Sequence, residues 1–375
     1  LDGHEWETFA RISSVAFDRD GNLVVLDRGN QKVVKVDGAG ELLSEMGGAG
    51  GGPGEFGSPV SLSVLPDGTV VVFDVRKRGF SIFHADGTFG RTVPLVGGFE
   101  AMPGGGMTPH PSGGVISSGM MMTRVSSGGI QTSGDSDTRP LFRYSLDDGS
   151  WEAIFKAWRP VGSGPPEITP RSGGTAVVYA GAGEKVFEPD LHFGILPDGS
   201  LAVVDSVTYA VKVVGEDGFV RRTLLRPIEP RAVTREDKDR ERAKRMEDLA
   251  EGGGIAISGG GRVSRGTPSS EVRKSIADNL EFAEEIPVIH DLAVDWEGRV
   301  WVERCGEEGF EGGPIDLLTS DGDYLGTLAR NEVRIPDAFG PDGLVAFIEK
   351  DEFDVPRVEV KKLVLSESLT ETPGR

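Results

Sequence analysis

The chain has 375 residues, 37% of them apolar, with 55 glycines and 23 prolines, which is typical of a folded β-protein with many tight turns. Its net charge of −20 argues against nucleic acid and anionic membrane surfaces as partners. Cys305 is the single cysteine, which excludes an internal disulfide and a cysteine-based zinc site. No run of about 18 apolar residues could span a membrane, and a start at Leu1 is compatible with a targeting segment that has been removed.

One unit of four short strands, with an Asp-Gly turn between the first two, recurs along the chain. In the first copy, Ile12–Phe17 and Leu23–Asp27 flank Asp20-Gly21, and Lys32–Val36 and residues 41–44 follow. Alternating apolar positions around such turns predict β-hairpins. Further copies are centred on Asp67-Gly68, Asp198-Gly199, Glu297-Gly298 and Asp342-Gly343, and a degenerate third copy on Gly113-Gly114.

Six such units predict an all-β fold, a six-bladed β-propeller that forms one domain over residues 1–375. The last unit lacks its outer strand, and residues 6–10 form a spare strand with no unit of its own. We therefore expect the N-terminal strand to close the last blade beside residues 357–365, because ring closure removes exposed sheet edges. A helical and glycine-rich insertion, residues 229–287, is predicted between blades four and five.

The links between blades and the loops between second and third strands must lie on one face of such a ring. The turns on the other face are all short, so we expect the face with the long insertions to be the functional one. The largest insertion begins with Thr234 and Asp237 in a capping-box pattern, which predicts a helix over 235–251, and a second helix is predicted over 270–285. The insertions are residues 47–58, 96–109, 123–140, 158–189, 229–287 and 304–314.

The strand–Asp-Gly–strand–Asp pattern is followed after the first unit by Gly52-Pro53-Gly54-Glu55-Phe56. Together these resemble bacterial six-bladed propellers of the NHL-repeat-like type, specifically over residues 11–86 and more loosely over 190–365. That family is mostly of unknown function and includes many secreted or periplasmic proteins, so the resemblance implies a periplasmic or extracellular location. It is also similar to propeller enzymes, among them peptide-amidating lyases and lactonases. The glycine run matches G-x-G-x-x-G, but no helix follows it, so we predict no dinucleotide or other organic cofactor.

Histidines and carboxylates recur at the starts of first strands, where their side chains could reach the channel mouth. His192, His290 and Asp291 are the catalytic candidates. A converging set of such side chains could instead hold Zn²⁺ or Ca²⁺. The candidate metal ligands are His110, Asp190, His192, His290 and Asp337.

The resemblance to amidating lyases covers only one of these positions. His290, in the segment Ile289–Val294, matches the context of a zinc-binding histidine of that family, whereas His192 is one residue out of register. Lactonase-type propellers use asparagine and acidic calcium ligands, and the asparagines here fall in turns, loops, linkers and helices. Asp27, Asp74 and Asp205 each end a second strand, and this recurrence predicts a structural role in capping the next loop.

Two functional hypotheses follow. In the first, the protein is a non-catalytic extracytoplasmic binding or scaffold propeller. It docks a protein partner or a small ligand through the insertion-rich face, within an extracytoplasmic or membrane-associated complex. The alternative is a metal-dependent hydrolase or lyase, lactonase-like or amidating-lyase-like, with its site at the mouth of the central channel.

Overall fold

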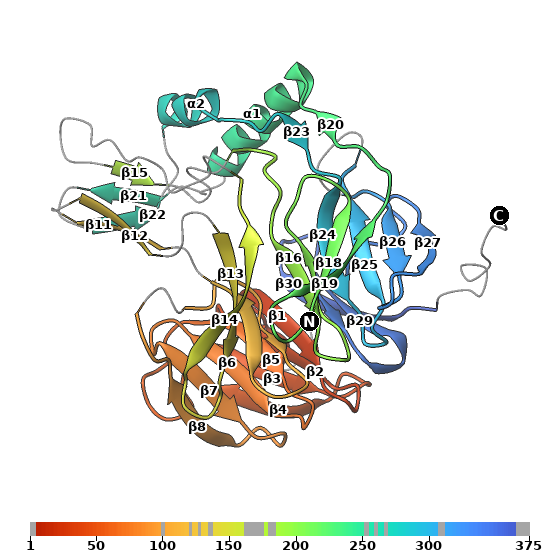
Figure 1. Ribbon diagram of the computed structural model, residues 1–375. Helices are drawn as coiled ribbons and strands as arrows, with labels where there is room; N and C mark the ends of the chain where they lie inside the picture. The colour runs from red at the N-terminus through yellow and green to blue at the C-terminus, as the bar shows by residue number, and fades with distance from the viewer. Residues whose placement is uncertain are drawn as a thin grey trace.

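The computed structural model describes residues 5–98, 102–119, 122–126, 129–133, 138–160, 176–178, 185–250, 255–258, 262–265, 269–306 and 312–364. Six antiparallel sheets follow one another along the chain, and we name them blades one to six (Figure 1). Blade one is β1 (Ile12–Phe17), β2 (Leu23–Asp27), β3 (Lys32–Val36) and β4 (Leu42–Gly47); blade two is β5 (Pro59–Val64), β6 (Val70–Asp74), β7 (Gly79–Phe83) and β8 (Phe89–Pro94); blade three is β9 (Thr108–Pro109), β10 (Val115–Ser118), β13 (Thr138–Tyr144) and β14 (Trp151–Trp158).

The second half of the chain repeats this order. Blade four is β16 (His192–Ile195), β17 (Leu201–Val204), β18 (Ala210–Val214) and β19 (Val220–Leu225); blade five is β24 (Ile289–Val294), β25 (Val300–Arg304), β26 (Ile315–Leu318) and β27 (Tyr324–Leu328); blade six is β28 (Ala338–Phe339), β29 (Leu344–Lys350) and β30 (Pro356–Lys362). The six-bladed propeller predicted from the repeats is confirmed.

The local sequence explains why each blade forms. The Asp-Gly turns place glycine where φ is positive, as at Gly21 (80°) and Gly68 (84°), a conformation that side chains disfavour. Second strands such as β6 (Val70–Asp74) are buried on both faces and read as continuous apolar runs. Outer strands such as β8 (Phe89–Pro94) are mostly exposed and carry polar residues. Burial therefore decreases from the inner strands to the rim.

Hydrophobic clusters pack each blade against the next, and one of them joins blade six to blade one. In that cluster Phe17 and Val25 of blade one meet Ala346 of blade six. Gly340 is required there, because a Cβ atom at this residue would come within 2.7 Å of the Phe17 ring. The ring closes through this face-to-face packing.

The predicted N-terminal strand is wrong. Glu5–Glu7 form a short 3₁₀ helix, residues 8–11 form no strand, and blade six has three strands within the described part of the chain. The physical reason lies in Asp27, whose buried carboxylate accepts hydrogen bonds from the backbone N–H groups of Ala10 (3.0 Å) and Arg11 (2.9 Å). These bonds hold residues 10 and 11 against the end of β2 in blade one, and the segment pairs with no strand of blade six.

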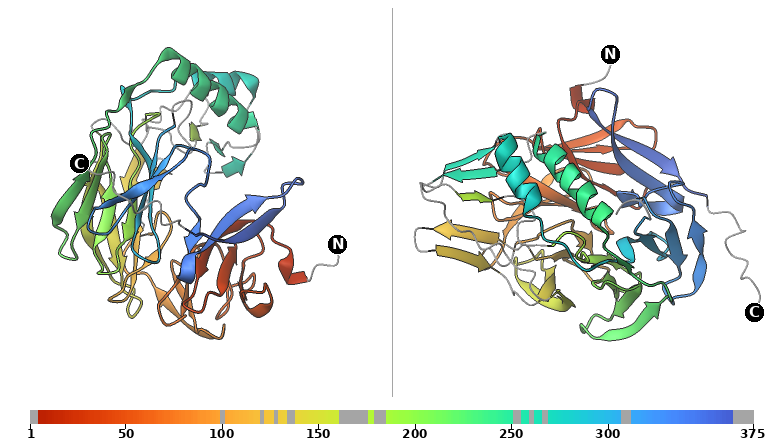
Figure 2. Two further views of the ribbon diagram at one scale, coloured as in Figure 1. Left: turned by 90° about the vertical axis from the view of Figure 1, so that its right-hand side faces the viewer. Right: turned by 90° about the horizontal axis from the view of Figure 1, so that it is seen from above.

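The long insertions lie together on one side of the ring, at the top of Figure 1, and we call this side the insertion face and the other the turn face. Viewed from that side, α1 and α2 lie across the ring (Figure 2). β15 and β21 come from different inter-blade links yet pair with each other, and β20 pairs with β23. The strands and helices within these insertions are β11 (Met122–Ser126), β12 (Gly129–Ser133), β15 (Ala176–Val178), β20 (Arg231–Ala232), α1 (Arg235–Ala250), β21 (Ile255–Ser258), β22 (Arg262–Arg265), α2 (Ser270–Asp278) and β23 (Glu285–Ile286).

The predicted capping box begins α1. Asp237 accepts hydrogen bonds from the backbone N–H (2.9 Å) and the hydroxyl (2.6 Å) of Thr234, whose hydroxyl in turn accepts from the Asp237 N–H (3.2 Å). The second predicted helix is shorter than expected, because α2 ends at Asp278 and the chain then turns at Asn279 toward β23. Within the described ranges, neither helix is long and apolar enough to cross a bilayer.

Candidate functional site

The recurrent aspartates are structural, as predicted. Asp74 is fully buried, and its carboxylate accepts backbone N–H groups of Gly57 (2.6 Å), Ser58 (3.0 Å), Arg76 (2.9 Å) and Lys77 (3.1 Å). The carboxylate therefore joins the link before its blade to the loop that follows its strand. Asp27 does the same in blade one through Arg11 and Gly29. Asp205 in blade four accepts from the Trp158 N–H and from Lys212.

His192 and Asp291 meet at the insertion-face ends of two inner strands. Nδ1 of His192, on β16, lies 2.9 Å from Oδ1 of Asp291, on β24. Strand register explains the meeting: His192 pairs with Val204 and Asp291 with Glu303, each one residue before the end-of-strand position that Asp205 and Arg304 occupy. The two residues therefore hold equivalent places in adjacent blades, and His192 meets Asp291 rather than His290.

The imidazole of His192 is held in one orientation. With Nδ1 bonded to the carboxylate, Nε2 is the free acceptor of the neutral ring. Nε2 is shielded from solvent and has no hydrogen-bond partner in the part of the chain that the structure describes. Such a nitrogen can take up a proton or accept a hydrogen bond from a bound molecule.

Glu303 joins this site, and the sequence reasoning missed it. It lies directly opposite Asp291 in the β24–β25 register, next to an irregularity in the pairing at His290. It is 6% exposed, and burial raises the pKa of its carboxyl group, while its Oε1 atom accepts the Gly312 N–H at 2.9 Å. The sequence signal that could have identified Glu303 is its position on the second strand of blade five, which pairs with the first strand that carries His290 and Asp291. We call His192, His290, Asp291 and Glu303 the inner-strand cluster.

The other predicted residues do not join this cluster. His110 is buried in the β9–β10 turn on the turn face, where Nε2 lies 3.0 Å from the Gly199 carbonyl and Nδ1 lies 2.8 Å from the Ser112 hydroxyl. Asp337 accepts the Ile348 N–H at 2.8 Å and pairs with Arg334 at 2.8 Å in blade six. Asp190 precedes β16 and is exposed.

The candidate metal ligands lie apart from one another in the described structure. Among the residues that the structure describes, no three His, Cys, Asp or Glu side chains come together in a way that suits a metal ion. The Zn²⁺ or Ca²⁺ expectation stays a prediction, and we derive no chemical step through a metal. Cys305 contributes no nucleophile, because burial raises the pKa of its thiol to about 12.

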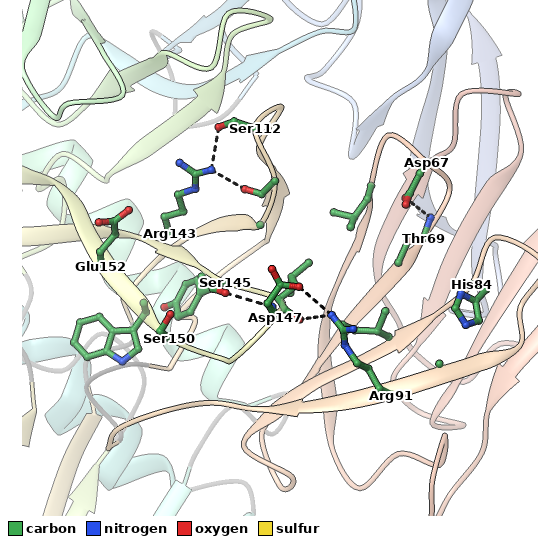
Figure 3. Close-up of a pocket in the computed structure, with 18 residues that line it drawn as sticks. Asp67, Thr69, His84, Arg91, Ser112, Arg143, Ser145, Asp147, Ser150 and Glu152 are labelled. Carbon is green, nitrogen blue, oxygen red and sulfur yellow. Dashed lines mark hydrogen bonds and ion pairs between the residues drawn. The ribbon is translucent and has the colours of Figure 1, made fainter.

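A large groove lies on the turn face between blades two and three, with a volume of about 940 Å³ (Figure 3). Its two arginines are already engaged by turns of blade three. Arg91 donates to the Leu146 carbonyl at 2.9 Å, and Arg143 donates to the Ser112 hydroxyl at 2.9 Å and to the Gly113 carbonyl at 3.0 Å. These bonds fix the turns, and no group of the inner-strand cluster lies here.

Comparison with known proteins finds structural likenesses and no match in sequence. No family model matches the chain, and no curated protein matches it. The chain is similar in structure to virginiamycin B lyase from Staphylococcus aureus (13% identity, 97% of this chain and 98% of that chain, TM-score 0.42). A Bacteroides fragilis protein named as exported aligns at 12% identity over 92% and 82%, with a TM-score of 0.46. A gluconolactonase from Xanthomonas campestris aligns at 13% identity over 93% and 82%, with a TM-score of 0.38.

Such low identities do not transfer an activity, so any functional argument must come from the residues of this chain. The narrower assignment to the NHL-repeat-like type stays a prediction.

Proposed function

We propose that the protein is a binding or scaffold propeller that docks a protein partner or a small ligand through its insertion face. The observation that carries this proposal is the pairing of β15 with β21, in which Ala176 lies opposite Ile257. Two inter-blade links that are far apart in sequence thereby build one sheet over one end of the ring. The turn face carries only short turns fixed by their own hydrogen bonds.

Further contacts hold this layer together. An isolated bridge between Val186 and Phe282 again joins the two links, and α1 packs on α2. A layer anchored at several points offers a preformed surface, which lowers the entropic cost of binding. As part of this proposal, the protein acts in the periplasm or outside the cell, in an extracytoplasmic or membrane-associated complex, and its sequence resemblance to secreted propellers supports that location.

The test is affinity capture from the periplasmic fraction or culture supernatant of the producing cell. Deletion of residues 252–268 removes β21 and β22 and should abolish capture of the partner. Phe219→Ser is the control, because Phe219 is 69% exposed in a turn of the turn face and should leave capture unchanged. Loss of the partner with Phe219→Ser alone would contradict the proposal.

The second candidate is a hydrolase or lyase at the inner-strand cluster, favoured by the His192–Asp291 contact of 2.9 Å. In this scheme Asp291 orients the imidazole, Nε2 of His192 removes a proton, and Glu303, whose protonated form is favoured by burial, donates one. A positioned base contributes about 10²–10⁴-fold to a rate.

A screen with lactones, esters and peptide substrates tests this candidate. His192→Gln and Asp291→Asn should each lower any activity found by roughly 10²-fold or more. Elemental analysis of the purified protein for zinc and calcium tests the metal-dependent form. An activity that both variants retain would remove the inner-strand cluster as its site.

A further inference from the structure

A cavity of about 500 Å³ lies on the insertion face beside the end of β25. Arg231, Arg304 and Arg330 reach it from three separate segments: the start of the large insertion, the end of β25, and the chain after β27. The link before β24 and the loop after β25 form the remaining walls through Pro287, Val288, Cys305 and Gly306. Neither functional hypothesis uses this cavity.

Strand register shows that Arg304 occupies the repeat position of the structural aspartates. Asp27 pairs with Ile12 and Asp74 with Pro59, each just before an irregularity in the ladder. Arg304 pairs with Ile289 before the same irregularity in blade five. A cation thus stands where blades one and two carry a buried carboxylate.

The cavity lies between the two segments that this carboxylate joins in the other blades. In blade one Asp27 accepts N–H groups of Arg11, in the link, and of Gly29, in the loop. Counting from the paired positions, the corresponding residues of blade five are Val288 and Gly306, and both line the cavity. In blade five, a cavity and an arginine therefore occupy the position where blades one and two have a negatively charged aspartate.

The charges around the cavity are not balanced. Arg226 (2.5 Å) and Arg304 (3.4 Å) share the buried carboxylate of Asp316. Arg231 (2.6 Å) and Arg240 (3.6 Å) share Asp237.

Two further charged side chains that line the cavity are exposed to solvent. Glu229 is acidic, and the guanidinium of Arg330 makes no hydrogen bond or ion pair within the described residues. The described lining of the cavity thus holds three arginines and one carboxylate, Glu229, in a chain with a net charge of −20, and two of these arginines each share a carboxylate outside the lining with another arginine. Cys305 adds no charge, because burial raises the pKa of its thiol to about 12.

We propose that this cavity binds an anionic group, a carboxylate or a phosphate, with Arg304 and Arg330 as its cationic partners. The charge of the ligand would stand where the aspartate stands in blades one and two. Guanidinium groups suit this task, because their N–H donors match the oxygens of both anions in pairs. The proposal names a ligand chemistry for the insertion face and in that respect rests on the proposed function.

Isothermal titration calorimetry of the purified protein tests it with two probes, inorganic phosphate and succinate, at an ionic strength held constant with sodium chloride. We expect saturable binding of at least one probe, and the stronger of the two identifies the anion class. Arg304→Gln and Arg330→Gln should each weaken this binding by about tenfold or more, since each removes a charge-assisted hydrogen bond.

Arg222→Gln is the matched control. It removes the same charge from the turn face, where Arg222 pairs with Asp321, and should leave the affinity unchanged. Thermal unfolding of each variant shows that it is folded, and Arg330 is exposed, so its substitution keeps the test informative if Arg304→Gln is unstable. The proposal is overturned if neither probe binds, if Arg222→Gln weakens binding equally, or if Arg330→Gln has no effect.

The anion site and the docking proposal can fail separately. The strands of this segment that the structure describes, Ile255–Ser258 and Arg262–Arg265, do not line the cavity, so deletion of residues 252–268 should leave anion binding intact while it abolishes partner capture. Anion binding that persists when no partner is captured by any form of the protein would support the cavity and count against the docking function.

Discussion

The end of the second strand looks different in blade two and in blade five, although the strand register is the same. In blade two, Asp74 is fully buried, and four backbone N–H groups satisfy it. In blade five the same position is Arg304, beside a cavity and next to the buried Glu303. In blade two the residue at this position stabilises the fold. A blade with a different residue at this position can use it for another function.

The largest effect is expected where the repeat is intact. Asp74→Ala removes a fully buried carboxylate and leaves four partly buried backbone N–H groups without their acceptor, and we expect a loss of about 3 kcal/mol in the free energy of unfolding. Urea denaturation measures it. Asp321→Ala, at a side chain that is 80% exposed, is the control and should change stability by less than about 0.5 kcal/mol. Equal losses of stability in the two variants would contradict the structural role of Asp74.

A smaller loss in the free energy of unfolding is expected when the buried carboxylate of Asp316, in blade five, is replaced. Asp316→Asn removes the counter-charge of Arg226 and Arg304 while it keeps the shape of the side chain. Because both arginines are partly exposed to water, we expect about 2 kcal/mol rather than the full cost of an unpaired buried charge. The same denaturation assay should rank this variant between Asp74→Ala and the surface control.

Glu303→Gln should change how stability depends on pH. Burial raises the pKa of Glu303 in the folded state, so folding favours its protonated form. Its contribution to stability is complete below the unfolded pKa of about 4.3 and is lost as pH rises through the folded pKa. The variant, which stays neutral, should match the wild type near pH 4 and exceed it increasingly at higher pH. A difference that does not vary with pH would show that Glu303 ionises as it does in the unfolded chain.

The smallest effect on stability is expected at the candidate functional residue. His192 is 21% exposed, and its partner Asp291 is 39% exposed, so water weakens their interaction. His192→Gln should therefore change the free energy of unfolding by less than about 1 kcal/mol. A loss as large as that of Asp74→Ala would assign His192 to the framework rather than to a site.

Sequence periodicity was sufficient to predict the blades, because a turn such as Asp20-Gly21 demands a positive φ that glycine supplies at once. It also predicted the role of Asp27 correctly, since a repeated position implies a repeated task. Residues 6–10 were misassigned, because their composition suits a strand and only the three-dimensional position of the Asp27 carboxylate diverts them.

Only part of the candidate site could be predicted from the sequence, again because some of its contacts depend on three-dimensional position. The one-residue offset between His192 and His290 was visible in the sequence, but that it brings His192 to Asp291 depends on how adjacent blades align. Glu303 and Arg304 were hidden, because their importance rests on the pairing irregularity at His290 and on packing around the loop. Side chains that act through contacts between blades leave little trace in a one-dimensional pattern.

The contact between Phe17 and Gly340 has a mechanical consequence. Among the described residues no strand is exchanged between the first and last blades, so side-chain packing holds the seam between them without a ladder of main-chain bonds. When the molecule is warmed, the ring should part first along this seam. Amide protons of β1 and β29 would then exchange with deuterium sooner than those of β17 and β25, deep within the opposite half.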